Sequence, residues 1–277
     1  MDGPMSPQPT LARRALGRGL RRLREAAGMT IPEAAAEIRY SRQTVTRIER
    51  GEQPTRTQQV ESLCGVYGAP PEQLSYLTAL AFASSQRGWW EAHKEGAFPE
   101  FRVYAEAEQE AAVIQVFEPE FIPGIAQTED YVRALQATDP PPSPDQATAI
   151  REFRLKRQDL LYARKPAPRI EMVIGMSAIG YLDHDPALRD AQIDKLRRLG
   201  QLPGVDVRIA ARLHAAMGTA FTVLTPGQDD GPPFAYMDAM DGCRYVEETV
   251  VVSHYQRAFV RAREVASPIK EYRYDAR

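Results

Sequence analysis

Five polar side chains stand within six consecutive positions of the chain, and their types suit contacts with base pairs. They are Arg42, Gln43, Thr44, Thr46 and Arg47. An arginine can bond guanine through two donors, a glutamine amide can bond adenine, and a threonine methyl can contact thymine. This mixture predicts a surface that reads base edges in double-stranded DNA.

The stretch around these residues is typical of two short helices joined by a tight turn. Thr30 and Ser41 are good caps for the first turns of the two helices. Val45 and Ile48 have the spacing of a helix face that packs on a core, and Gly51 ends the second helix. Each polar residue taken singly also fits a solvated face of an ordinary helix. The combined pattern favours a helix-turn-helix whose second helix enters the major groove.

Two longer stretches, LRRLREAAGMT and SRQTVTRIERGEQPT, resemble the helix-turn-helix domain of the Cro and phage-repressor superfamily, the Xre-type regulators. The resemblance covers residues 11 to about 80 and implies an all-α, five-helix DNA-binding domain. Two positions depart from the pattern. Ile31 stands where the family usually has a phosphate-gripping glutamine, and Arg39 stands where the turn usually has a glycine. A residue other than glycine needs a tolerated backbone or a slightly different turn there, and Arg39 can instead reach a phosphate.

The same resemblance implies that the loop after the second helix lies near the DNA backbone, which makes Gln53, Thr55 and Arg56 candidates for phosphate contacts. The predicted DNA-binding residues are therefore Arg39, Ser41, Arg42, Gln43, Thr44, Thr46, Arg47, Gln53, Thr55 and Arg56. The six arginines of the expected first helix, residues 11–27, either touch the DNA backbone or only solvate that helix.

Length and charge indicate two domains of different character. The 277 residues are enough for two cores. Residues 1–60 hold 11 arginines against 6 acidic residues, a net charge of +5, whereas the remainder carries −7. A basic head on an acidic body fits a phosphate-binding module joined to a domain that does not bind nucleic acid.

The composition also indicates the cellular compartment that we expect for the protein. No apolar run is long enough to span a membrane, and residues 1–10 lack the apolar core of a signal peptide. We therefore expect a disordered lead-in over residues 1–10 of a cytoplasmic protein. Cys64 and Cys243 have no ligand-spaced neighbours and are expected to be reduced packing residues.

The domain boundaries follow from changes in pattern. We place the DNA-binding domain at residues 11–84 and an α+β regulatory or partner-binding domain at residues 89–277. In the second domain, helices are expected at residues 100–110, 128–137, 145–164, 186–202 and 250–266. Strands are expected at residues 112–117, 170–174, 205–210, 220–224, 234–238 and 244–247. The fold class is therefore α+β, with a mixed, mostly antiparallel sheet after the all-α head.

The second domain also carries a resemblance, through WW, FEPEFIPGIAQTEDYVRAL and RLKRQDLL. These stretches are similar to the C-terminal domain of Scr1-type, antitoxin-like regulators of actinobacteria, which implies a regulatory or partner-binding domain without naming a ligand. Two later stretches depart from that pattern, at Met176-Ser177 and at residues 210–212.

Six residues of this domain are candidates for a ligand or partner site. They are Trp89, Trp90, Gln127, Thr128, Arg157 and Gln158. The tryptophan pair also fits an interdomain anchor. The other four residues either converge on a ligand or form a buried network that ties two helices together, and the network is the reading that we favour.

Catalytic patterns are missing from the sequence. The four histidines have neither metal-ligand spacing nor a nucleophile elbow beside them, and neither a GxGxxG motif nor a P-loop occurs. Asp183-His184-Asp185 precedes Pro186 and reads as the entry to a helix. We expect no enzyme activity, no cofactor and no metal.

Three hypotheses follow. The first is a sequence-specific DNA-binding transcriptional regulator that works as a homodimer, with a C-terminal domain that dimerises or senses a small-molecule effector or a partner. The second is an antitoxin-like adapter that binds a small partner protein and autoregulates its own operon. The third is an enzyme with a DNA-binding appendage, which clustered titratable groups in a deep pocket would support.

Overall fold

The computed structural model describes residues 11–84, 99–137, 143–214, 216, 218–227, 231–239 and 242–273. The chain divides into two compact units, residues 1–106 with 240–244 and residues 107–239 with 245–277. The expected lead-in of residues 1–10 and the Trp89-Trp90 pair lie outside the described residues, so both stay predictions.

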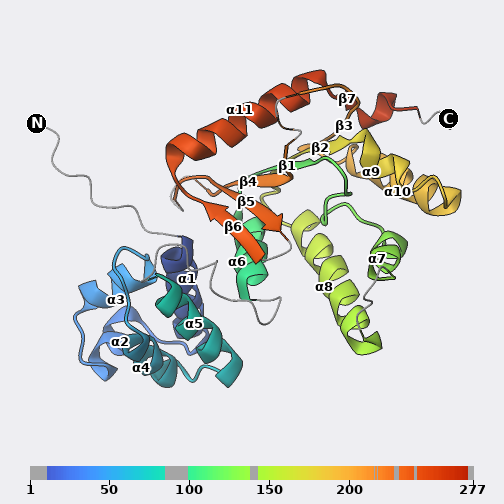
Figure 1. Cartoon of the computed structure of the whole chain (residues 1–277). Helices are drawn as coiled ribbons and strands as arrows, with labels where there is room; N and C mark the ends of the chain where they lie inside the picture. Colours follow the sequence, from blue (N-terminus) through green and yellow to red (C-terminus); the bar gives the residue numbers. More distant parts are fainter. Residues whose placement is uncertain are drawn as a thin grey trace, which may run out of the picture. The chain divides into compact units, whose positions relative to one another are not determined.

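The first unit consists of helices throughout residues 11–84 (Figure 1). The helices are α1 (Leu11–Ala26), α2 (Ile31–Glu37), α3 (Arg42–Glu49), α4 (Thr57–Tyr67) and α5 (Pro71–Ser84). Thr30 and Glu33 form a capping box at the start of α2, and Gly68 ends α4 with a left-handed φ of 66°. The local signals of the sequence therefore place these helix ends.

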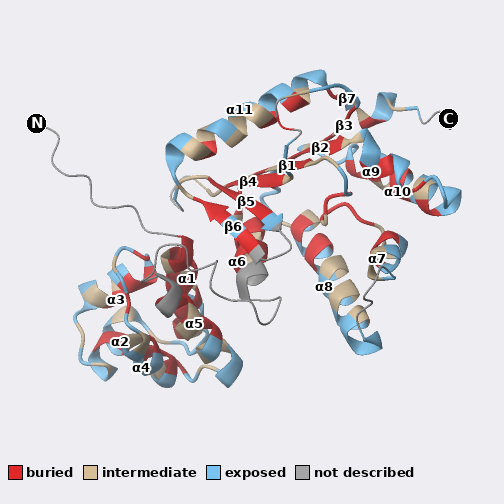
Figure 2. Cartoon of the chain, in the orientation of Figure 1, coloured by how far each residue is buried: buried red, intermediate tan, exposed pale blue. Residues whose placement is uncertain are grey.

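α1 is the central helix of this unit and contacts α3, α4 and α5. The core that these helices share is fully buried and aliphatic (Figure 2). It includes Leu16, Leu20, Val45, Ile48, Leu63 and Leu77. Each such side chain stabilises the fold by about 1.5–3 kcal/mol, so Val45 and Ile48 hold α3 through its inner face, as their spacing predicts.

The second unit alternates helices and strands. Its helices are α7 (Glu129–Gln136), α8 (Pro144–Tyr162), α9 (Met176–Gly180), α10 (Pro186–Leu199) and α11 (Thr249–Val265), and α6 (Pro99–Glu110) spans the division between the units. Its strands are β1 (Val113–Glu118), β2 (Arg169–Gly175), β3 (Val205–Ala210), β4 (Phe221–Thr225), β5 (Phe234–Ala239), β6 (Gly242–Val246) and β7 (Ser267–Pro268), and the short 3₁₀ helix η2 covers Ile269–Glu271. The sequence does not predict α9, β7 or η2, which have five residues or fewer and so carry little periodic signal.

The strands form one mixed sheet in the order β6-β5-β4-β1-β2-β3-β7. The described pairings are antiparallel for β1 with β4, β4 with β5 and β3 with β7, so the sheet is mostly antiparallel, as expected. Its centre differs, because β1 pairs with β2 and β2 with β3 in parallel. Helical crossovers lie between these strands in the sequence, which is what parallel pairing requires.

α11 crosses one face of this sheet and contacts β1, β2, β3, β4 and β5 (Figure 1). The core beneath it takes alternate residues from the strands, such as Phe117 of β1 with Phe221 and Val223 of β4. Val252, Phe259 and Ala262 of α11 complete this core. The inner face of α11 is therefore fixed, and its outer face is left to solvent.

Candidate nucleic-acid interface

The outer face of α3 presents four of the predicted base-reading residues together. A helix turns by 100° per residue, so Arg42, Gln43, Thr46 and Arg47 share an arc of about 140°. Arg42, Gln43 and Arg47 are exposed, and Thr46 is half-buried. No described residue hydrogen-bonds or ion-pairs with the side chains of Arg42, Gln43 or Arg47. Their donors and acceptors are therefore available to a ligand.

The hydroxyl groups at the start of α3 serve the helix itself. The Thr44 backbone N–H donates to Ser41 Oγ over 3.1 Å, and the Ser41 and Thr44 hydroxyl oxygens lie 2.8 Å apart. The Thr46 hydroxyl donates to the Arg42 carbonyl over 2.9 Å. This bond satisfies the Thr46 hydroxyl and leaves its methyl group for apolar contact. Ser41 acts as the helix cap that the sequence predicts.

The turn between α2 and α3 places Arg39 in an uncommon conformation. Its φ is 57°, in the left-handed region that favours glycine. The turn therefore keeps the conformation that a glycine would adopt, and the arginine tolerates it. The Arg39 side chain is exposed beside the start of α3, where it can approach a phosphate.

The three residues of the loop after α3 that are predicted to contact phosphates differ in exposure. Arg56 is exposed and Gln53 is half-exposed, whereas Thr55 is only 4% exposed. The Arg56 backbone N–H donates to Gln59 Oε1 over 2.9 Å, which fixes the first turn of α4. The prediction for Thr55 needs correction, because its side chain is packed inside and cannot reach a phosphate. Gln53 and Arg56 keep their predicted placement on the surface.

A buried ion pair, which the sequence does not predict, fixes α3 against α1. Arg24 Nε and Nη2 donate to the two carboxylate oxygens of Glu49 over 2.7 Å and 2.8 Å. Arg24 Nη1 also donates to the Met29 carbonyl over 2.8 Å. The pKa of Arg24 lies above its usual range, mainly because Arg24 donates these hydrogen bonds to Glu49. Arg24 therefore neither touches DNA nor solvates its helix, the two roles considered for it.

A close backbone approach supports the same contact between α1 and α3. A Cβ atom at Gly17 would lie 2.4 Å from the Glu49 carbonyl oxygen and 2.6 Å from that of Ile48. Only glycine allows this separation. The sequence shows a glycine at position 17 but does not show that the end of α3 packs against it.

Gln127, Thr128 and Gln158, three of the candidate residues of the second unit, lie together in a buried polar network. Gln127 Nε2 donates to the Ile122 carbonyl over 2.8 Å, and Gln158 Nε2 donates to the Gly124 carbonyl over 2.8 Å. Lys195 Nζ donates to Gln158 Oε1 over 2.6 Å, and its burial lowers its pKa. These bonds tie residues 122–128 to α8 and α10.

The other polar side chains of this region are also engaged. The Thr128 N–H donates to Gln192 Oε1 over 2.9 Å, and Gln192 is fully buried. Arg157 forms two bonds with Glu108, one of them 2.6 Å long from Nη2 to Oε1, and Glu108 is 0% exposed. The network reading of these four candidates therefore agrees with their placement.

The described residues contain no group of three or more His, Cys, Asp or Glu side chains placed to hold a metal. Asp185 caps α10, as its position before Pro186 suggests. Burial and the nearby Asp238 raise the pKa of Glu118, at the end of β1, to about 7. Cys64 and Cys243 are both buried and form no disulfide among the described residues, and burial raises the pKa of the Cys64 thiol to about 11.

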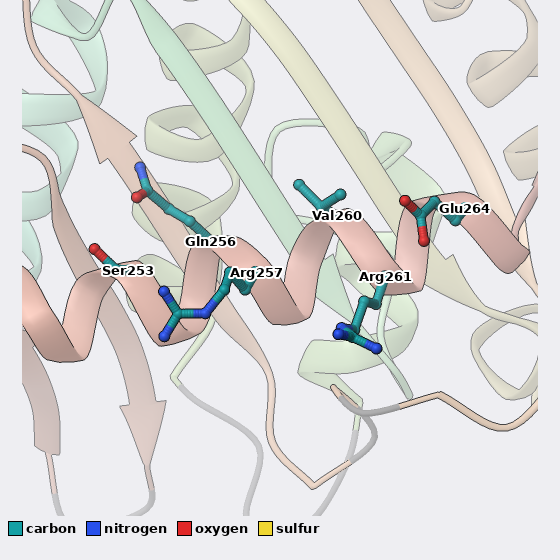
Figure 3. A pocket seen from close by; sticks show the side chains of 6 residues that line it. All are labelled: Ser253, Gln256, Arg257, Val260, Arg261 and Glu264. Carbon is teal, nitrogen blue, oxygen red and sulfur yellow. The ribbon is translucent and has the colours of Figure 1, made fainter.

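A shallow, solvent-open pocket of about 610 Å³ lies against the outer face of α11 (Figure 3). Its lining consists of Ser253, Gln256, Arg257, Val260, Arg261 and Glu264. The sequence predicts this segment only as a closing helix, because the apolar residues of its inner face dominate its pattern.

Comparison with known proteins divides the chain at nearly the same place. Residues 101–273 match the family described as Domain of unknown function (DUF5753). The chain belongs to this family. Residues 15–77 match the family described as Helix-turn-helix domain. No curated protein and no solved structure matches the chain.

The helix-turn-helix match covers most of α1, all of α2 to α4 and part of α5, including every predicted DNA-binding residue. It supports the assignment of the first unit to DNA binding. The DUF5753 match covers α7 to α11 and the whole sheet, and its description assigns no activity. None of the helices in the described part of the chain has the length and apolar character that a membrane crossing requires.

Proposed function

We propose that the protein is a sequence-specific transcriptional regulator that reads an operator with α3. The observation that carries the proposal is the outward arc of Arg42, Gln43 and Arg47 on a capped, well-packed helix. Their side chains are exposed and bond to no residue that the structure describes. Arginine and glutamine in these positions can bond guanine and adenine in the major groove. The match of this unit to a helix-turn-helix domain supports the same function.

The backbone contacts are assigned to residues on either side of α3. Arg39 precedes the helix, Gln53 and Arg56 follow it, and all three side chains face solvent to some degree. Such contacts fix the register of the protein on the duplex and carry no sequence information of their own. The net charge of +5 on residues 1–60 favours the approach to DNA.

The DUF5753 domain is assigned a role in dimerisation, with effector sensing as a further possibility for the same domain. A helix-turn-helix that binds alone contacts one short half-site, and a two-fold dimer doubles that contact. The adapter alternative would need a partner surface in this domain. The polar residues that the sequence offered for such a surface, Gln127 and Gln158 among them, are bonded inside the fold.

Selection of bound DNA from a random pool tests the proposal. We expect enrichment of a two-fold symmetric motif whose half-sites lie about 10 base pairs apart, one helical turn. The Arg42→Ala and Gln43→Ala variants serve as the matched pair, because each should relax the preference at a different base. A pool that shows no enrichment, or an enriched motif unchanged in both variants, would contradict the proposal.

A further inference from the structure

Three arginines that the fold encloses wholly or in part use the same edge of the guanidinium group differently. Arg24 and Arg157 each direct Nε and Nη2 at the two oxygens of a buried glutamate. Arg154, on α8, donates from Nη1 to Gln127 Oε1 over 2.7 Å, and its Nε and Nη2 bond to no described residue. Arg154 therefore presents the edge that binds a carboxylate elsewhere in this chain, and no carboxylate of the described residues occupies it.

The guanidinium group of Arg154 is fixed in place and remains accessible. Gln127, which holds it, is 4% exposed and donates to the Ile122 carbonyl over 2.8 Å. Burial is the main reason that the pKa of Arg154 lies below its usual range. Its Nε and Nη2 are not among the buried atoms that lack a partner, so solvent reaches both. A fixed and partly desolvated pair of donors binds an anion more strongly than an arginine on the open surface does.

A carboxylate without a bonded partner lies in the same region. Glu118, the last residue of β1, is half-buried, and its side chain bonds to no described residue. Burial is the main cause that raises the pKa of the Tyr131 hydroxyl, Glu118 raises it further, and Arg154 lowers it. Both charges therefore act on one hydroxyl group, although no ion pair joins these two described side chains. A group of each sign is thus available to a ligand.

The alternation of side chains along β1 and β4 turns Glu118 and Thr222 away from α11. Phe117 and Phe221 belong to the core beneath α11. Glu118 and Thr222, the next residues of their strands, therefore face the opposite side of the sheet, where α7 and α8 lie (Figure 1). Thr222 is 5% exposed, and its hydroxyl makes no hydrogen bond with a described residue. Since a buried hydroxyl normally has a partner, this oxygen is a further group for a ligand.

Asp238 of β5 brings a second carboxylate to this side of the sheet. The registers of β1 with β4 and of β4 with β5, continued by one residue, align Ala220 with Glu118 on one side and with Asp238 on the other. Ala220 contributes only a methyl group between the two carboxylates. Burial is the largest influence on the pKa values of Glu118 and Arg154, and Asp238 also acts on both, which agrees with this placement.

We propose that Arg154, Glu118, Asp238 and Thr222, the Arg154 cluster, bind a small amino acid, that is, a molecule with one carboxylate and one ammonium group. Arg154 binds the carboxylate through Nε and Nη2. Glu118, Asp238 and Thr222 supply three acceptors, which equals the number of donors on an ammonium group. The inference rests on the proposed function, in which the DUF5753 domain senses an effector, and it names the chemical class of that effector.

A metal ion or a simple anion fits the Arg154 cluster less well. The described residues contain no group of three or more His, Cys, Asp or Glu side chains placed to hold a metal, and Arg154 repels a cation held by two carboxylates alone. A simple anion pairs with Arg154 but is repelled by Glu118 and Asp238. A molecule that carries both charges pairs with all of these groups.

Glu118 gives the binding reaction a measurable proton change. Burial and, after it, Asp238 raise the pKa of Glu118 to about 7, so about half of these side chains carry a proton at pH 7. An ammonium group beside the carboxylate favours its ionised form. Binding should therefore release roughly half a proton per bound amino acid at pH 7 and almost none at pH 9.

Calorimetric titration of the full chain with each of the common amino acids tests the site. Methylamine and acetate serve as probes that carry only one of the two charges. We expect at least one amino acid to bind at least about ten-fold more tightly than either of these probes. Titration in two buffers of different ionisation enthalpy measures the released proton.

Two pairs of variants locate the binding. Arg154→Gln and Glu118→Gln each remove one charge of the cluster and should weaken binding at least about ten-fold, and Glu118→Gln should also abolish the proton release. Lys156→Gln and Glu120→Gln remove exposed charges two positions away along the chain and should bind as the wild type does. Circular dichroism establishes that each variant is folded. Glu118→Gln preserves the size of the side chain, so it tests the site even if Arg154→Gln does not fold.

Three outcomes would overturn the site. They are a chain that binds no amino acid, single-charge probes that bind as tightly as the best amino acid, and binding that is unchanged in Glu118→Gln and Arg154→Gln. Operator binding with and without the amino acid separates the two proposals. A chain that selects an operator but binds no amino acid keeps the proposed function and loses the Arg154 cluster. A chain that binds the amino acid but no DNA loses the proposed function while the site stands. An operator affinity that the bound amino acid leaves unchanged would contradict the effector role alone.

Discussion

Arginine and glutamine side chains serve opposite purposes in the two units. On α3, the side chains of Arg42 and Gln43 are exposed and make no bond to any described residue. On α8, Arg157 and Gln158 are 8% and 4% exposed, and both bond to groups of their own unit. Neighbouring residues of the same two types thus form a free surface in one unit and an internal brace in the other.

The comparison shows that residue type alone does not identify a binding site. Buried polar groups need partners, because an unpaired one loses its bonds to water. Arg157 and Glu108 bond to each other inside the fold, so these groups are engaged there and do not form a ligand-binding surface. The α3 residues remain solvated and can exchange water for DNA. Substitutions in the two units should therefore affect different measurements, stability in one and DNA affinity in the other.

Arg157→Ala should have the largest effect on stability. It leaves the fully buried Glu108 carboxylate without its partner, and breaking a buried pair in this way costs about 3–5 kcal/mol. Urea denaturation of the full chain, followed by the fluorescence and circular dichroism of the second unit, measures the loss. Arg151→Ala removes a more exposed arginine of the same helix, paired with Glu129 over 3.3 Å, and should cost under about 1 kcal/mol. Equal losses of unfolding free energy in the two variants would show that the Arg157–Glu108 pair does not stabilise the second unit.

Glu118 should make the stability of the second unit fall as pH rises. Burial and Asp238 raise its pKa from 4.5 to about 7, so the folded state holds the proton more tightly than the unfolded state does. Stability that is present below pH 4.5 is lost progressively up to about pH 7, by roughly 3 kcal/mol. Glu118→Gln removes this titration, and its advantage over the wild type should appear at pH 8 and vanish near pH 4.5. Parallel stability curves of the two proteins would show that Glu118 is not responsible.

The sequence predicts some parts of the two units better than others. The caps Thr30 and Ser41, the inner residues Val45 and Ile48 and the stop at Gly51 lie within one local stretch, and each acts through neighbours in sequence. The sequence therefore predicts α2 and α3 well. Thr55 is the exception, because its burial depends on packing that the loop sequence does not reveal.

Long-range partners could not be predicted. Arg24 could have faced water or DNA, and its pairing with Glu49 follows only from the packing of α1 on α3. The same holds for Arg157 and Glu108, which lie 49 residues apart. The parallel centre of the sheet was hidden for a related reason, since strand spacing shows the crossovers but does not determine which strands become neighbours.

Arg42→Ala should reduce base discrimination without reducing stability. Loss of a bidentate contact to a base costs about 1–3 kcal/mol of discrimination at one position. Because the Arg42 side chain is exposed and bonds to none of the described residues, the melting temperature of the first unit should not change. Competition binding with operators substituted at single positions measures the discrimination. If the Arg42→Ala variant is unfolded, Arg42 is needed for stability, as Arg157 is, and the two units do not differ in the way proposed.

Arg56→Ala should have the smallest effect and a different form. Arg56 is exposed at the start of α4 and is assigned to a phosphate, so its loss should weaken all DNA sequences alike. The slope of log affinity against log salt should become shallower by about one unit, because one fewer counterion is released. Arg198→Ala on α10 removes the same charge far from α3 in the sequence and should leave the slope unchanged. A sequence-selective loss for Arg56→Ala would instead place its side chain in a groove, and the set of base-reading residues would then extend beyond α3 into the following loop.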